Sequence, residues 1–431
     1  MTASGFRSRL TGLPDAVYVF GLMAGLYVVF TGLTVLLNFE LAGVVNTLRA
    51  ITYFSAVYAM VVLALNLHWG YTGLFNLGVA GFMAVGVYTM AIVSGPTNPG
   101  PAEIPGLGMS LWVGVVAGVV VAGLVGVLAS LPALRLEADY LAIVTLALSE
   151  IIRLVLNSTL IQEVSVFGVT FGTGGATGLT VQNNPQTPVT AFFQSWPGSA
   201  ITDMAMAIGI NRPTVVEGIG YAIVLGAVVG LLFVFVRRIA TSPFGRVLKA
   251  IREDQVVAAA LGKDTRWFKI IIFGVGCGLM GLAGILWYGS DGYINPLSFR
   301  PNITFYVFVA LIIGGAGSNT GSIIGGSIFA SVLFYLPQFL EQNSTPVLDG
   351  IQSVLGGSTA TPQTVIDAGG ALVGLDLTAF LAYCFANISS LRFIGVGLIL
   401  IYLMQRRPDG LFGHRIETAA SVPLTTGDTD E

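Results

Sequence analysis

The chain has 431 residues, 54% of them hydrophobic and only 10% charged, with a mean hydropathy of +0.83. Because soluble domains carry about 25% charged residues, this composition excludes a water-soluble globule, and a net charge of −3 excludes a broadly basic nucleic-acid binder. The two cysteines, Cys277 and Cys384, and two histidines exclude a disulfide framework and a His-rich metal site, so we expect no metal and no cofactor.

Ten apolar stretches approach the 20 or so residues that cross a bilayer core of about 30 Å. They are Val17–Leu37, Ile51–Trp69, Leu74–Ser94, Leu111–Leu134, Tyr140–Leu160, Ile219–Val236, Ile270–Tyr288, Ile303–Ala316, Ile323–Phe339 and about Gly369–Met404. The first is too long for the apolar region of a signal peptide and predicts an uncleaved helix. The last is interrupted by Asp376 and Arg392 and predicts a short or re-entrant piece plus a final helix. The sequence predicts an all-α integral membrane protein with about ten transmembrane helices.

The distribution of Lys and Arg predicts the orientation in the membrane. Residues 237–269 hold eight of the 19 basic side chains, and Arg7, Arg9 and Arg135 also fall on the inner side if ten spans are counted. Both termini are then cytoplasmic. The expected division is a cytoplasmic N-terminus 1–16, a transmembrane domain 17–413 with external loops 161–215 and 340–368 and a cytoplasmic loop 237–269, and a polar cytoplasmic tail 414–431.

The 237–269 loop predicts two short helices. Ser242 and Pro243 suit a helix start, Glu253–Asp254 a kink, and Gly262 a helix stop. Val247, Leu248 and Ile251 recur at helical spacing, as do Val257, Ala258 and Leu261, and these residues form an apolar stripe. One interpretation is a solvated charged loop on anionic lipid, and the other is a docking element whose stripe fills a groove of a soluble partner.

Five motifs, in family order over about residues 60–413, resemble those of ABC-importer permeases for branched-chain amino acids. The resemblance is to the larger of the two permease subunits that pair in these importers. The motifs are Leu134–Arg153, Thr173–Leu179, Ser242–Gly262, Gly314–Ser318 and Arg407–Gly413. The permeases of urea importers are near cousins. The resemblance implies the ABC-importer permease fold, a prokaryotic cell membrane, and as partners ATP-binding subunits, a second permease and an extracytoplasmic substrate-binding protein. It implies that coupling to the ATPase involves Gly245, Leu248, Ala250, Ile251, Arg252, Glu253, Asp254, Leu261 and Gly262.

Candidates for the translocation pathway or gate come from polar and glycine residues in or beside the spans. Glu150 and Arg153 share a helix face, and either form a structural ion pair or belong to the gate. Asn66, Asn76 and Gly78 flank a predicted turn whose backbone groups either meet the substrate or are satisfied by neighbours. His68 in that turn is predicted to lie at the membrane edge. The motifs add Tyr140, Thr145, Gly174 and Gly175.

Six glycines lie between Gly314 and Gly326, and Gly317, Gly321 and Gly325 are at helical spacing. This series favours close helix packing, and a flexible hinge is the alternative.

The sequence lacks a Gly-x-x-x-x-Gly-Lys-[Ser/Thr] phosphate loop, so we expect a transport subunit without catalytic residues, whose ATP hydrolysis lies on a partner. The alternatives are an ion-coupled secondary transporter using Glu150 and Asp376, a urea or amide permease, and a membrane scaffold.

Overall fold

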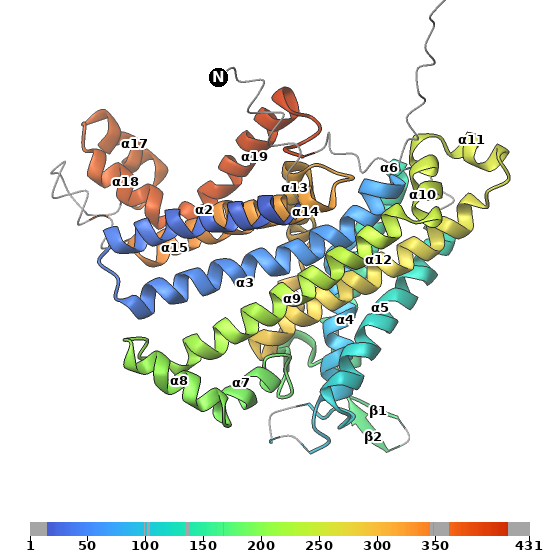
Figure 1. The fold of residues 1–431 in the computed structure, drawn as a ribbon, viewed down its shortest axis with the longest axis horizontal. Helices are drawn as coiled ribbons and strands as arrows, with labels where there is room; N and C mark the ends of the chain where they lie inside the picture. Colours follow the sequence, from blue (N-terminus) through green and yellow to red (C-terminus); the bar gives the residue numbers. More distant parts are fainter. Residues whose placement is uncertain are drawn as a thin grey trace, which may run out of the picture.

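The computed structural model describes residues 15–98, 100, 104–133, 138–166, 168–344, 348 and 362–412. Within these residues the fold is a helical bundle with two small antiparallel ribbons, so the predicted helical class is confirmed (Figure 1). Arg7, Arg9, Arg135, most of the predicted 340–368 loop and the 414–431 tail lie outside the described residues.

The elements up to residue 210 are α2 (Asp15–Leu36), α3 (Leu41–Leu65), the π-helical turn η1 (Asn66–Gly70), α4 (Val79–Ser94), α5 (Leu111–Ala133), α6 (Ala138–Leu156), η2 (Thr159–Ile161), β1 (Val164–Val166), β2 (Val169–Phe171), η3 (Gly175–Thr177), β3 (Leu179–Thr180), α7 (Thr187–Gln194) and α8 (Gly198–Ala207). In the β1–β2 ribbon Val164 pairs with Phe171, and in the β3–β4 ribbon Leu179 pairs with Ile294.

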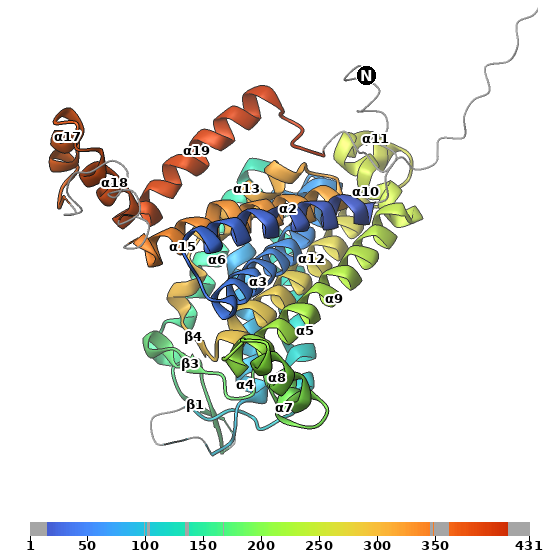
Figure 2. The ribbon, with the colours of Figure 1, turned by 60° about the vertical axis from the view of Figure 1, so that its left-hand side comes forward.

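The remaining elements are α9 (Pro213–Thr241), α10 (Pro243–Glu253), α11 (Gln255–Ala260), α12 (Thr265–Tyr288), η4 (Gly289–Asp291), β4 (Tyr293–Ile294), η5 (Pro296–Phe299), α13 (Asn302–Gly314), α14 (Asn319–Ile328), the π-helical turn η6 (Phe329–Tyr335), α15 (Leu336–Gln342), α17 (Val365–Val373), α18 (Leu377–Ala386) and α19 (Ile388–Arg406). Figures 1 and 2 place α10 and α11 at one end of the long helix α9, and α7 and α8 at the other end.

The core lies around α3, α4 and α12, which pack against one another. Every residue from Ala56 to Leu65 of α3 is buried. The outer helices α5 and α9 instead expose large apolar side chains, among them Leu124 and Leu231. A long helix exposes many large apolar side chains only where lipid, and not water, surrounds it. The bundle therefore combines a protein-buried centre with an apolar outer surface.

Small residues allow the helices to approach closely. On α5, the residues Gly114, Gly118, Ala122, Gly126 and Ser130 recur every fourth position and are all buried. A methyl group on Gly118 would lie 2.5 Å from the carbonyl oxygen of Gly86 on α4.

The predicted glycine series behaves in two ways. Gly321 and Gly325 lie on α14, and a methyl group on Gly325 would lie 2.1 Å from the Ala310 carbonyl oxygen of α13. Gly317 is outside the helix, with a φ of +91°. Gly321 and Gly325 therefore allow α14 to pack closely against α13, whereas Gly317 lies in the turn before α14.

The predicted number of about ten membrane crossings is not confirmed. Among the described residues, six helices are long and apolar enough to cross a membrane, or seven if the bent α18–α19 pair is one span. The helices α4 and α13 are apolar but shorter, with 16 and 13 residues. The 19-residue helix α6 carries three charged side chains, Asp139, Glu150 and Arg153. Length and apolarity alone therefore support six or seven spans.

The interrupted final stretch is bent, as expected. The axes of α18 and α19 differ by 89°. The bend lies at Asn387, which ends α18 and precedes α19. Asp376 lies at the other end of α18, where its carboxylate accepts a hydrogen bond from the Ala379 N–H at 3.1 Å and caps the start of the helix. Arg392 lies over the rings of Tyr306 and Phe334 at 5.8 and 5.3 Å, which offsets the cost of a charge among apolar helices.

Candidate functional site

The predicted pair of short helices in the 237–269 loop is confirmed. The Ser242 hydroxyl accepts a hydrogen bond from the Gly245 N–H at 3.2 Å and starts α10. The Asp254 carboxylate accepts from the Val256 and Val257 N–H groups at 2.8 and 3.0 Å and starts α11. Gly262 follows α11 with a φ of +78°, a conformation that stops helices and favours glycine. Local capping therefore defines both helices.

The apolar stripe of α10 faces the protein itself. Leu248 and Ile251 are 0% and 4% exposed, and a methyl group on Gly245 would lie 2.3 Å from the Ile239 carbonyl oxygen. The expectation that the stripe fills a partner's groove is therefore wrong for Leu248 and Ile251, because these side chains are already packed. Ala250, Arg252, Glu253 and Asp254 are exposed.

The exposed apolar side chains lie on and beside the second helix. Val256 is 78%, Val257 54% and Leu261 73% exposed. Glu253 and Asp254 lie beside them at the kink. We call Val256, Val257 and Leu261 the α11 patch. An apolar patch bordered by charge, on a short and rigidly capped helix, has the features of a protein contact surface.

Arg252 joins this helix pair to the interior of the bundle. Its Nη1 atom donates a hydrogen bond to the carbonyl oxygen of Gly70 in η1, the break that follows α3. One turn earlier, the Lys249 ammonium lies 5.6 Å from the centre of the Tyr71 ring. A cavity of about 400 Å³ opens beside these contacts, between η1, α10, the end of α13 and the segment around Asp409.

The break after α3 is tied to the glycine-rich segment before α14. The Asn66 side chain accepts from the Gly317 N–H at 2.8 Å and donates to the Asn319 Oδ1 atom at 3.1 Å. The Tyr71 hydroxyl donates to the same Asn319 oxygen at 3.0 Å. All three side chains are buried. The sequence singled out Asn66 and Gly317 but missed Asn319 and Tyr71, which carry no motif of their own.

A second buried network joins the same break to α12. The His68 Nδ1 atom lies 3.1 Å from the Asn76 side-chain amide nitrogen, and Nε2 lies 3.2 Å from the carbonyl oxygens of Ile272 and Phe273. Because two carbonyls can only accept, these partners assign the ring proton to Nε2 and make Nδ1 the acceptor. His68 is fully buried in the bundle, which the sequence did not predict, while its position at the membrane edge stays a prediction.

The segment before α4 is fixed within this network. The Asn76 Oδ1 atom accepts from the Gly78 N–H at 2.8 Å, and the Thr145 hydroxyl of α6 accepts from the Leu77 N–H at 2.9 Å. The structure thus brings together four predicted pathway residues, Asn66, Asn76, Gly78 and Thr145, around one break. Their hydrogen-bonding groups have partners within the protein.

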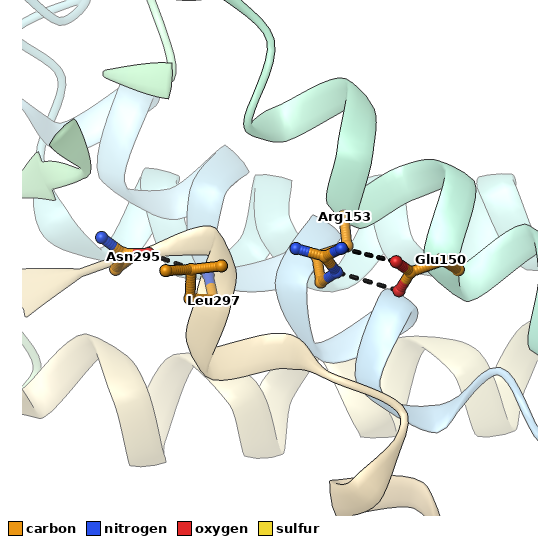
Figure 3. Close-up of polar contacts among 4 residues, drawn as sticks. All are labelled: Glu150, Arg153, Asn295 and Leu297. Carbon is orange, nitrogen blue, oxygen red and sulfur yellow. Dashed lines mark hydrogen bonds and ion pairs between the residues drawn. The ribbon is translucent and has the colours of Figure 1, made fainter. Parts of the chain in front are cut away.

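The other predicted pathway residues lie apart from this break. Figure 3 shows Glu150 and Arg153 facing each other on α6, beside η5, with two contacts at 2.9 and 2.5 Å. Tyr140 is 60% exposed on the outside of α6. Gly174 and Gly175 have positive φ angles in the buried turn before β3. The ion pair is thus an i,i+3 contact within one helix, and the two glycines shape a turn.

The last described segment completes the site. The N–H groups of Leu411 and Phe412 donate to the carbonyl oxygens of Ile313 and Gly314 at 2.9 and 3.0 Å. These are terminal carbonyls of α13, which no helical residue can satisfy. Gly410 needs to be glycine because its φ is +74° and a methyl group would lie 2.5 Å from the Ile312 carbonyl oxygen. Three motifs distant in sequence, Ser242–Gly262, Gly314–Ser318 and Arg407–Gly413, therefore meet around one cavity.

Comparison with known proteins agrees with the resemblance carried by the motifs up to Ser318. Residues 47–351 match the family described as "Branched-chain amino acid transport system / permease component". The chain is 30% identical over 301 residues, 69% of its length, to the high-affinity branched-chain amino acid transport system permease protein LivM of Escherichia coli K12, and 32% identical over 270 residues, 62% of its length, to LivM of Salmonella typhimurium.

These matches span 65% and 58% of the length of the two LivM proteins. A shorter match of 98 residues, 22% of the chain and 30% of the relative, is 35% identical to the permease protein LivH of Salmonella typhimurium. No solved structure matches the chain.

Proposed function

Because the chain belongs to the family of branched-chain amino acid transport permeases, we propose that it is a membrane-spanning permease subunit of an ATP-driven importer for branched-chain or related amino acids. The observation that carries this proposal is the meeting of three distant family motifs around the α10–α11 pair and the α3 break. Substrate movement through the chain needs no covalent chemistry, so its residues serve conformational change and binding.

The proposal includes four kinds of partner. ATP hydrolysis lies on separate ATP-binding subunits, since the sequence has no phosphate-binding loop. A second permease subunit is supported by similarity to both LivM and LivH. An extracytoplasmic binding protein delivers the substrate, and lipid surrounds the apolar outer helices. The basic loop 237–269 and both termini are placed in the cytoplasm of a prokaryotic cell, following the distribution of Lys and Arg.

We place the ATPase contact on the α11 patch and the neighbouring charges Glu253 and Asp254. The buried side chains of α10, with Arg252, then hold the helix pair to the bundle, so a displacement of α11 moves the α3 break. Gly245, Leu248 and Ile251 take part in coupling by fixing α10 to α9 and α12, and not by touching the ATPase.

Leu261→Asp tests this contact, and Leu160→Asp is the matched control. Leu261 is 73% and Leu160 86% exposed, so neither change disturbs the core, but Leu160 lies in η2, far along the chain from the patch. An aspartate in the apolar contact loses its hydration without gaining a partner, which costs more than about 1.4 kcal/mol and weakens binding more than tenfold.

Co-purification of the ATPase with each variant measures the contact. We expect loss with Leu261→Asp and retention with Leu160→Asp. Equal retention in both variants would show that the α11 patch is not the contact. Uptake of labelled leucine, isoleucine and valine by the reconstituted complex tests the substrate class, and competition by urea instead would contradict it.

A further inference from the structure

The helices α7 and α8 form a fixed unit at the end of α9 that lies away from α10. Phe193 of α7 packs against α9, where a methyl group on Gly220 would lie 2.3 Å from the Phe193 ring. Ile210 and Val215 form a small buried cluster with Phe193. The Thr190 hydroxyl also donates to the Glu217 carboxylate at 3.4 Å. The unit is therefore held at the level of the first turns of α9.

This unit exposes an apolar stripe that nothing in the chain covers among the described residues. Ile201, Met204 and Ile208, at spacings of three and four, are 47%, 72% and 68% exposed, and Trp196 before α8 is 84% exposed. Residues 187–208 contain one charged side chain, Asp203, which points to a different face of α8 because it is about 200° around the helix from Ile201.

The position of the unit along α9 gives its depth in the membrane. The first basic residue near the α10 end of α9 is Arg237. About 20 helical residues cross the hydrocarbon core, and counting back from Arg237 reaches Glu217. The side chains of Ile223 and Leu231, which lie between, are 67% and 71% exposed, as lipid-facing residues are. Because α7 contacts Glu217, the α7–α8 unit lies at the boundary between hydrocarbon and headgroups.

We propose that the α7–α8 unit is an interfacial helix pair that lies in the lipid headgroup region of the leaflet opposite α10 and α11, with Trp196 and the α8 stripe in contact with acyl chains. Tryptophan is enriched at this depth because its ring is apolar and its N–H is polar. The unit packs against the first turns of α9, whose exposed apolar side chains include Ile223, and this argues for lipid as the occupant of the α8 stripe. Without Lys or Arg, the unit is held by apolar contact and needs no anionic lipid.

Spin labels report this environment directly. Met204→Cys and Ile208→Cys are labelled in the full-length protein carrying Cys277→Ala and Cys384→Ala, reconstituted in phosphatidylcholine vesicles. Asp203→Cys is the matched control on the other face of α8. We expect collisions with oxygen to exceed those with a water-soluble nickel chelate at positions 204 and 208, and the reverse at 203. Adding phosphatidylglycerol should leave these ratios unchanged.

Two results would overturn the proposal. If the nickel chelate reaches positions 204 and 208 as readily as 203, the stripe lies in water. If both collision agents are excluded at 204 and 208 once the partner subunits are added, a protein covers it. Neither readout depends on transport, so the inference fails or holds independently of the proposed function. The monodispersity of each labelled variant in detergent confirms that it is folded.

Discussion

Replacing Arg252 by glutamine should uncouple ATP hydrolysis from uptake without detaching the ATPase. The Arg252 guanidinium spans the contact between α10 and the α3 break, where it donates to the Gly70 carbonyl oxygen. Glutamine is shorter and neutral, so this bond is lost. The α11 patch lies on the other helix of the pair and keeps its exposure, so docking should persist.

The size of the effect follows from the type of bond. A hydrogen bond from a charged group to a backbone carbonyl contributes about 1.5–3 kcal/mol. A tenfold change in an equilibrium corresponds to about 1.4 kcal/mol. If the bond distinguishes the coupled from the uncoupled position of α10, its loss should lower uptake per ATP hydrolysed by about 10- to 100-fold. Arg252→Lys keeps the charge but not the reach or geometry of the guanidinium, and should give an intermediate loss.

Proteoliposomes containing the assembled importer allow both rates to be measured on one preparation, as labelled leucine taken up and phosphate released. Arg246→Gln is the control, because Arg246 is an exposed arginine on the same helix. The reasoning is refuted if Arg252→Gln leaves the ratio of uptake to hydrolysis at the level of the control. Loss of the ATPase from the Arg252→Gln complex would equally refute it, since the residue would then act in docking.

Two further substitutions test the packing described above. Gly325→Ala should lower the melting temperature in detergent, because overpacking against the α13 backbone costs about 1–3 kcal/mol. Gly230→Ala is the control and should leave the melting temperature unchanged, because no atom lies within 4 Å of the added methyl group. Equal melting temperatures of the two variants would contradict the close α13–α14 contact. Asn76→Leu should destabilise the protein by about 1–3 kcal/mol because it leaves the His68 Nδ1 atom without its donor, and an unchanged melting temperature would contradict that network.

The features that the sequence predicted well depend on neighbouring residues. The Ser242 cap, the Glu253–Asp254 kink and the Gly262 stop each act within one or two helical turns, so the α10–α11 pair could be placed from sequence alone. Which face of α10 is buried could not, because an apolar stripe suits a partner's groove and the chain's own bundle equally well. Only the three-dimensional contacts show that Leu248 packs inside.

His68 and the number of spans show where local reasoning fails. The carbonyl oxygens that bind His68 belong to residues 204 and 205 positions later in the chain, and no local pattern indicates them. Apolar length also does not distinguish a helix surrounded by protein from one surrounded by lipid. Both the α3–η1 span and the α5 span are long and apolar, but 83% of the residues in the most apolar part of the first are buried and only 22% in the second. The helices α4 and α13 are also apolar, but they are short.

The pairing of the Leu411 and Phe412 N–H groups with the end of α13 has a consequence for biogenesis. The ribosome releases α13 well before residues 411 and 412 exist, so two of its terminal carbonyls must be solvated by water or held by another molecule during that interval. The cavity beside α10 is likewise incomplete until Pro408 and Asp409 arrive. The end of the bundle around α10 and the last turn of α13 therefore reaches its final hydrogen bonding only after residue 412 has been made.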